Sequence, residues 1–274
     1  MEGEEVTADY TLAEMMVVQA AREIAGCGSA FVGMGLPMLA TALAKFAHNP
    51  ALIYSTEVGV GDWDPPLAEI DRAPNGVADP ILDRSAAYAG DMVDALGAWL
   101  MGDRLEVAVL TGAEVDRFGN LNTLLIGDFA APDVRMPGTG GNTDAACLAR
   151  RVIAIMSLEP RRFVERVSFL ASPGYISGPG ARRAAGLRPQ GPNIVVSTMG
   201  VFGFDTPDGG DTGSCELQLL RTFPDTSADV VQALIAWPLR IAGNLDACAP
   251  PTDDELTLLH RLDPGPTYLR PGRY

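Results

Sequence analysis

The stretch of sequence that decides the fold runs from residue 29 to residue 46 and is SAFVGMGLPMLATALAKF. Its first four residues, Ser29–Val32, predict a short buried strand, and the segment Gly33–Pro37 predicts a tight glycine turn. Pro37 suits the first turn of a helix, which we expect to run to about Phe46. Met38 stands where a dinucleotide-binding fingerprint would need its third glycine. The stretch therefore predicts a strand–turn–helix unit without a dinucleotide site.

Similar units continue on both sides of this stretch. Thr11 and Glu14 form a capping-box pattern in front of an apolar segment with helical periodicity, which predicts a helix over residues 12–25. Further helices are expected over residues 86–101 and 142–148, and further strands over residues 51–54, 107–110, 152–156, 164–170 and 194–198. Alternating strands and helices with short links predict an α/β fold with a mixed, largely parallel sheet covered by helices. Without a repeat or a long polar linker, we expect residues 1–274 to form a single domain.

The charge balance excludes several classes of partner. The 274 residues carry a formal net charge of −15, and 47% of them are hydrophobic, as in a folded globular protein. We therefore expect no nucleic-acid partner, because a duplex is held through its phosphates, and no binding to anionic membrane surfaces. The start Met-Glu-Gly-Glu-Glu lacks the basic residues of a secretory signal, and the longest weakly polar run is too short to span a membrane. These features predict a cytoplasmic protein.

The sequence has few residues that could bind a metal ion or take part in histidine-based catalysis. Four widely spaced cysteines and two histidines, His48 and His260, give no metal-ligand spacing, so we expect no metal site. We interpret His48 as a cap at a helix end and His260 as a residue of a helix surface. The chain's one lysine, Lys45, is the only candidate for a Schiff base, and we interpret it instead as a solvent-facing charge on a helix.

Glu57 is the first candidate for chemistry. It follows an apolar strand and precedes Gly59 and Gly61, small residues that would let a substrate approach the backbone. In open α/β sheets, ligands bind at the carboxyl ends of the strands, and a carboxylate there can act as a base or a nucleophile. The alternative is a solvated loop glutamate, and the spacing alone leaves both interpretations open.

Two further groups of residues are candidates. The glycine-dense turn from Gly138 to Asn142 leads into a helix and could present backbone N–H groups to a phosphate or an oxyanion, although an ordinary strand-to-helix turn explains it equally well. Asp116, Asn120 and Asn122 lie in a segment expected to form a hairpin, where turn-forming side chains explain them without a function.

Several long segments resemble the β subunits of glutaconate CoA-transferases, within the class I CoA-transferase family. They are EVGVGD (57–62), GAEVDRFGNLNTLLIGDF (112–129), PGTGGNTDAA (137–146), RRFVERVSFLASPGYISGPG (161–180) and PTDDELTLLHRLDP (251–264). The resemblance covers nearly the whole chain and implies the open α/β fold of that family. It implies that Glu57 is the catalytic glutamate and that Gly138, Thr139, Gly140, Gly141 and Asn142 lie beside the thioester of coenzyme A.

The same resemblance implies a substrate and a partner. Val58, Gly59 and Asn120 would be candidates to line the site. Coenzyme A would enter as an acyl-CoA of a short dicarboxylic or 3-oxo acid, and an α subunit would complete the site at an interface. Two alternatives stay open: hydrolysis, decarboxylation or C–C hydrolysis of a CoA ester on the same scaffold, and a non-catalytic partner subunit.

Overall fold

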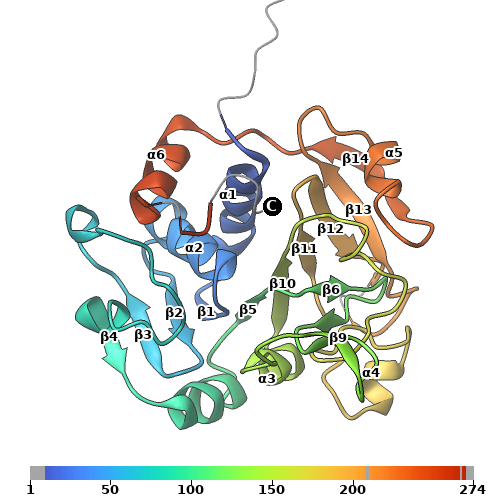
Figure 1. Cartoon of the computed structure of the whole chain (residues 1–274), viewed down its shortest axis with the longest axis horizontal. Coiled ribbons are helices and arrows are strands. Elements are labelled where there is room, and N and C mark those ends of the chain that lie inside the picture. The colour runs from blue at the N-terminus through green and yellow to red at the C-terminus, as the bar shows by residue number, and fades with distance from the viewer. Residues whose placement is uncertain (1–9, 208–209, 266, 270–274) are drawn as a thin grey trace, which may run out of the picture.

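A ten-stranded mixed sheet forms the centre of the molecule (Figure 1). The computed structural model describes residues 10–207, 210–265 and 267–269. In spatial order the strands are β14 (Arg240–Ala247), β13 (Leu217–Thr222), β12 (Gly200–Phe204), β11 (Ile194–Val196), β10 (Arg151–Ile155), β5 (Val107–Leu110), β1 (Ser29–Val32), β2 (Ile53–Thr56), β3 (Val60–Trp63) and β4 (Ala86–Ala89). The five strands from β11 to β2 run parallel, and antiparallel pairings flank them on both sides. The prediction of a mixed, largely parallel sheet is confirmed.

Both faces of the central strands are buried, because successive side chains point to opposite sides of the sheet. In β5, Val107 and Val109 belong to one apolar core, whereas Ala108 and Leu110 belong to the other. Helices α1 (Leu12–Ile24), α2 (Leu36–Leu43) and α6 (Asp253–Leu262) gather on one side of the sheet (Figure 1). The other core takes in side chains of α3 (Asn142–Leu148), α5 (Ala228–Gln232) and a π-helical segment, Val93–Met101. The short helix α4 (Ala181–Ala184) follows a long loop.

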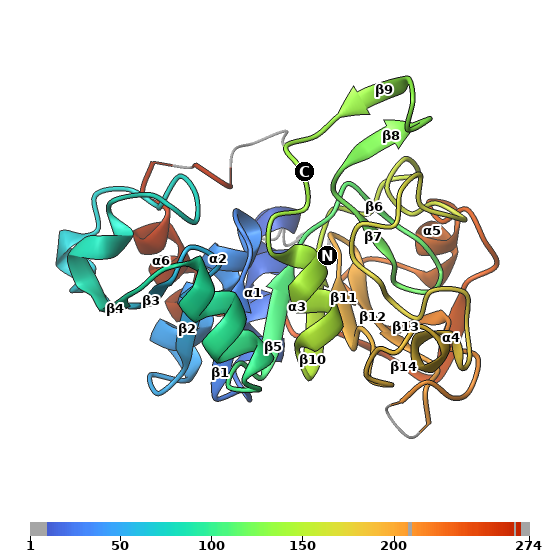
Figure 2. The ribbon, with the colours of Figure 1, turned by 90° about the horizontal axis from the view of Figure 1, so that it is seen from below.

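Two small hairpins are added to this body. Strands β6 (Glu114–Val115) and β7 (Leu121–Asn122) form the excursion expected after β5. Strands β8 (Leu125–Gly127) and β9 (Pro132–Arg135) form a second hairpin, which projects from the rest of the molecule (Figure 2). Strand β9 leads directly into the glycine turn at residues 138–141, so the projecting hairpin and this turn are structurally linked.

The prediction of one helix over residues 86–101 is wrong. Ala86–Ala89 forms the edge strand β4, paired antiparallel with β3, and the helix begins only at Val93. The break falls at Gly90, where an added Cβ would lie 2.4 Å from Cε1 of Tyr88. The alanine-rich sequence of residues 86–89 is compatible with a helix, but these residues form a strand because they pair with β3 and because the chain approaches Gly90 closely.

Two more expectations need correction. Residues 164–170 form no strand; they lie beside the β6–β7 hairpin, where the backbone N–H of Ser168 donates to the Glu114 carboxylate instead of to a neighbouring strand. Lys45 is buried rather than solvent-facing, because α2 continues into a π-helical turn, Ala44–His48, that packs against α1 and α6. Its Nζ donates to the carbonyl of Leu52 at 3.1 Å and to Oδ1 of Asp62 at 2.9 Å.

Within the described residues, no helix has both the length and the apolar character needed to cross a membrane. The acidic start of the chain, from which we expect no secretory signal, lies outside the described residues. His260 lies on the surface of α6, as expected, with 61% of its side chain exposed. His48 ends the π-helical turn after α2, and its Nε2 lies 3.2 Å from Oε1 of Glu255.

Candidate active site

A cavity of about 580 Å³ opens at the carboxyl ends of the central parallel strands. Gly33 follows β1, Glu57 follows β2 and Thr111 follows β5, and all three line it. The chain leaves β1 toward β2 on one side, whereas β5 and β10 lie on the other, so the strand order reverses beside β1. Ligands of open α/β sheets bind at such a reversal, outside the carboxyl ends of the strands.

Glu57 is placed by the sharp turn that joins β2 to β3. The backbone N–H of Gly59 donates to the carbonyl of Thr56 at 3.2 Å, and Gly59 has a φ of +92°. An added Cβ at Gly59 would lie 2.4 Å from the backbone nitrogen of Asp91. Only glycine fits this position, because other residues would meet both an unfavourable backbone conformation and a backbone atom. The turn therefore leaves Glu57 half-buried at the strand end.

The glycine turn at residues 138–141 lies directly against the Glu57 carboxylate. The backbone N–H of Gly141 donates a hydrogen bond to Oε2 of Glu57. An added Cβ at Gly140 would lie 2.7 Å from the same oxygen, and one at Gly141 would lie 3.0 Å from it. Gly138, Thr139, Gly140 and Asn142 also line the cavity. The structure thus brings together the two groups of residues that the sequence singles out separately.

Arg162 is a cavity residue that sequence reasoning missed. It follows β10 in the chain and shares the carboxylate of Glu159 with its neighbour Arg161. Burial acts to raise the pKa of Glu159, but the hydrogen bonds from Arg161 and Arg162 prevail and lower it. Arg161 extends into solvent with 76% of its side chain exposed, whereas only 25% of the Arg162 side chain is exposed. The segment 161–180 carries part of the family resemblance, but nothing in it marks Arg162 as the residue at the cavity.

Three predicted site residues lie elsewhere. Val58 and Gly59 are in the β2–β3 turn but are not among the residues that line the cavity. Asn120 is buried, and its amide is fully engaged: Nδ2 donates to Asp116 and to the carbonyl of Ile176, while Oδ1 accepts from two backbone N–H groups. Asn120 therefore holds the hairpin against the loop that contains Ile176, in agreement with the turn-forming interpretation.

The turn at Asp116 has an unusual carboxylate. Burial raises the pKa of Asp116 to about 6, although hydrogen bonds from Asn120 and from backbone N–H groups act in the opposite direction. Its Oδ1 accepts from the backbone nitrogens of Phe118 and Asn120 at 3.0 and 3.1 Å. These contacts make Asp116 a structural part of the hairpin, away from the residues that line the cavity.

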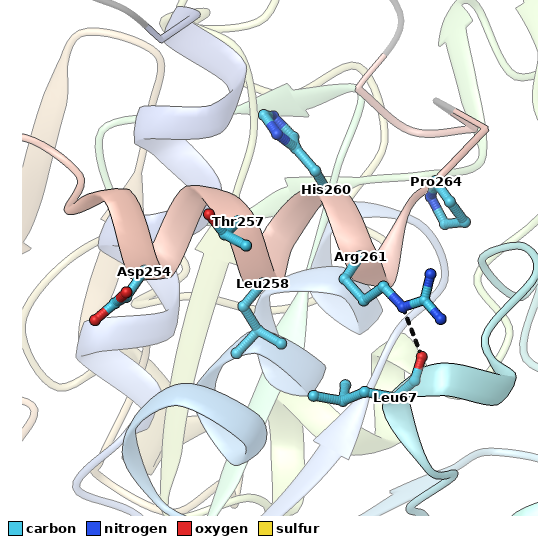
Figure 3. Close-up of a pocket in the computed structure, with 7 residues that line it drawn as sticks. All are labelled: Leu67, Asp254, Thr257, Leu258, His260, Arg261 and Pro264. Carbon is cyan, nitrogen blue, oxygen red and sulfur yellow. Dashed lines mark hydrogen bonds between the residues drawn. The ribbon is translucent and has the colours of Figure 1, made fainter.

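A second groove lies on the outer layer of helices (Figure 3). It is lined by Leu67, Asp254, Thr257, Leu258, His260, Arg261 and Pro264, and it shares no residue with the strand-end cavity. Nε of Arg261 donates to the carbonyl of Leu67 at 2.7 Å, which ties α6 to the segment after β3. In the described part of the chain, no cluster of three or more histidine, cysteine or acidic side chains is arranged to hold a metal ion.

The sequence of this chain is similar to those of known proteins. The family model described as Coenzyme A transferase matches residues 13–205. The B subunit of 3-oxoadipate CoA-transferase from Pseudomonas knackmussii is 33% identical over 254 residues, covering 93% of this chain and 94% of the relative. The B subunit of glutaconate CoA-transferase from Acidaminococcus fermentans is 28% identical over 270 residues, covering 96% of both chains.

Solved structures agree with these matches. The crystal structure of glutaconate coenzyme A-transferase from Acidaminococcus fermentans superposes with a TM-score of 0.85 at 28% identity, covering 96% of this chain and 98% of that chain. The decarboxylase AibA/AibB superposes with a TM-score of 0.77 at 22% identity, covering 94% and 98% of the two chains, a likeness that concerns the fold.

Proposed function

The chain belongs to the coenzyme A transferase family, whose substrates are CoA esters, and from this premise we propose that it is the B subunit of a CoA-transferase acting through Glu57. The proposed enzyme moves CoA between the acyl-CoA of a short dicarboxylic or 3-oxo acid and an acceptor carboxylic acid. The observation that carries the proposal is the contact of the Glu57 carboxylate with the Gly140–Gly141 backbone at the strand-end cavity. We also propose that residues 1–274 act as one domain, since a single sheet runs from Ser29 to Ala247.

The proposed reaction forms a covalent intermediate on Glu57. A carboxylate oxygen of Glu57 attacks the thioester carbonyl, the C–S bond breaks, and CoA thiolate leaves behind a mixed anhydride. The thiolate then attacks the glutamyl carbonyl, releases the first acid and leaves a glutamyl-CoA thioester. The acceptor carboxylate attacks this thioester, and the freed thiolate takes the new acyl group from the second anhydride, which restores Glu57. Each intermediate keeps the acyl group activated, so water must be kept out.

The contact with Gly141 suggests which step the glycine turn serves. The backbone N–H of Gly141 points at Oε2 of Glu57 itself, not at the space beyond the Glu57 side chain. A donor placed there stabilises the negative charge that develops on this oxygen when thiolate attacks the glutamyl carbonyl. One such donor is worth about 3 to 4 kcal/mol in comparable sites. We therefore assign the Gly141 N–H to the formation and breakdown of glutamyl-CoA.

A partner subunit is part of the proposal. Coenzyme A carries several negative charges, whereas this chain has a net charge of −15 and the described residues that line its cavity include one arginine, Arg162. The nucleotide therefore needs positive charge from another polypeptide. Exposed apolar side chains also favour a partner at this end: Met34 at the cavity is 53% exposed, and Phe129 and Val134 of the β8–β9 hairpin are 63% and 51% exposed. Both relatives in the comparison are named as the B subunit of a CoA-transferase.

Replacing Glu57 tests the proposal. In the complex with its partner subunit, Glu57→Gln is expected to abolish exchange of isotope between a free acid and its acyl-CoA, because the amide cannot form the anhydride. Incubation with acyl-CoA followed by borohydride should leave a reduced product on Glu57 in the wild type and none in the variant. Glu69→Gln is the matched control, since Glu69 is solvent-exposed on the segment after β3.

The same experiment separates the alternatives. Full exchange activity in Glu57→Gln would overturn the assignment of Glu57. A wild-type complex that consumes acyl-CoA without isotope exchange would indicate hydrolysis or decarboxylation instead of transfer. Absence of any adduct on Glu57 in an active complex would indicate a subunit that only completes an interface.

A further inference from the structure

Arg162 brings a positive charge to the cavity that contains Glu57. Among the described residues that line this cavity, Glu57 is the only acid and Arg162 the only base. A second cavity of about 300 Å³ adjoins the first and shares Met34, Thr111 and Arg162 with it. Arg162 is also the only charged residue among the described residues that line the second cavity. In the described part of the chain, a ligand with one end at Glu57 therefore meets one cation in the space around it.

The charge of Arg162 is only partly neutralised by its neighbours. Two guanidinium groups share one carboxylate, because Oε2 of Glu159 accepts from Nε of Arg161 at 2.6 Å and Oε1 accepts from Nε of Arg162 at 2.9 Å. Nη1 of Arg162 makes a long contact of 3.4 Å with the carbonyl of Gly112. Nη2 has no hydrogen-bond partner within residues 10–207, 210–265 and 267–269. A planar guanidinium with a free terminal nitrogen is suited to binding another carboxylate.

Two hydroxyl groups in the same cavities also lack partners. Ser157 is 2% exposed and lines the smaller cavity, and its Oγ has no hydrogen bond with any described residue. Thr123 lines the larger cavity, and its buried Oγ1 is likewise unpaired within the described part of the chain. Buried hydroxyl groups are nearly always hydrogen-bonded in folded proteins. Each of the two cavities that Arg162 lines thus contains one residue whose hydroxyl group is unpaired in the described part of the chain.

We propose that Arg162, with the hydroxyls of Ser157 and Thr123, binds the carboxylate of the substrate that does not react, and so selects dicarboxylic over monocarboxylic acids. This inference rests on the proposed function and names a residue that determines its specificity. A phosphate of coenzyme A is a poorer fit for Arg162, because the long pantetheine arm separates the phosphates from the thioester, which must lie at Glu57. The cation shares a cavity with Glu57, at the acyl end of the substrate.

Arg162→Met tests the proposal in the complex with the partner subunit. Acceptors are compared in pairs of equal chain length that differ in one terminal carboxylate: succinate with butanoate, glutarate with pentanoate, and adipate with hexanoate. For the preferred dicarboxylate, kcat/KM is expected to fall roughly 10- to 100-fold, because hydrogen bonds to a charged group are lost. Most of the loss should lie in KM, and kcat/KM for the matched monocarboxylate should not fall. Ser157→Ala should weaken the same preference by a smaller factor.

Arg161→Met is the matched control. It removes the neighbouring arginine from the same Glu159 carboxylate without changing a cavity residue, so the preference for dicarboxylates should persist. Arg162→Lys keeps the charge and should restore part of the preference. Equal losses on both acids in Arg162→Met, or a wild type that prefers no dicarboxylate, would overturn this inference and leave the proposed function standing. A wild-type complex that exchanges neither these acids nor short 3-oxo acids would overturn the proposed function itself.

Discussion

Gly140→Ala is expected to disable Glu57 while leaving the fold almost intact. Gly140 has a φ of +50°, and an added Cβ would lie 2.7 Å from Oε2 of Glu57. Ordinary van der Waals contact begins at 3.4 Å, so the carboxylate must withdraw by about 0.7 Å. The end of a flexible side chain moves at little cost, but the movement takes the carboxylate away from its place beside the Gly141 N–H. A misplacement of this size at a reacting group costs about 100-fold in rate.

The effect on stability should be small and separable from the effect on activity. Alanine in the left-handed region costs about 1 to 2 kcal/mol of unfolding free energy. Gly186→Ala is the matched control, because Gly186 also has a positive φ, of +74°, and an added Cβ there would meet nothing within 4 Å. Both variants should lose similar stability, whereas only Gly140→Ala should lose activity.

The two variants are compared by isotope exchange and by urea unfolding. We expect a fall of about 100-fold in kcat for Gly140→Ala with little change in KM, and wild-type kinetics for Gly186→Ala. Wild-type kcat in a folded Gly140→Ala complex would refute the reasoning, since the carboxylate and the added methyl group cannot occupy their places together.

Two further predictions concern ion pairs outside the residues that line the cavity. Asp79→Asn should lower the unfolding free energy by about 1 to 2 kcal/mol at neutral pH, because Arg72 pairs with both oxygens of Asp79 and holds the pKa of this carboxyl well below its usual range. Because the pKa of Asp79 is lowered in the folded state, the contribution of its carboxylate to stability is present above about pH 4 and is lost as the pH falls further. The difference in unfolding free energy between the variant and the wild type, measured by urea unfolding, should therefore shrink from pH 7 to pH 3. Lys45→Met should lower the unfolding free energy by about 2 to 4 kcal/mol, because Asp62 and the buried carbonyl of Leu52 lose their donor. In the same urea assay, the double variant that also carries Asp62→Asn should recover part of this free energy. A loss in the double variant that equals or exceeds the loss in Lys45→Met would contradict the ion-pair account.

Local patterns predict the central part of the fold because there the signals are local. The capping box of Thr11 and Glu14 forms as expected, and Pro37 stands in the first turn of α2. Prediction fails where a distant segment decides. Ala86–Ala89 has the composition of a helix but becomes a strand through pairing with Val60–Trp63. Lys45 has a helical neighbourhood that predicts exposure, yet Asp62, seventeen residues away in sequence, takes up its charge.

The same distinction explains which parts of the candidate site the sequence reveals. Glu57 is predictable because a carboxylate directly after a buried strand must stand at the sheet edge. Arg162 is not, because Arg161 beside it has the same chemistry and the same local sequence. A distant hairpin holds the backbone here: the N–H of Val115 donates to the carbonyl of Arg162 at 2.7 Å, and the N–H of Val164 donates to the carbonyl of Val115 at 3.0 Å. In this arrangement the side chain of Arg162 lines the cavity while Arg161 extends into solvent. The position of Glu57 at the sheet edge can thus be predicted from the sequence, whereas the position of the residue proposed to select the substrate depends on tertiary structure.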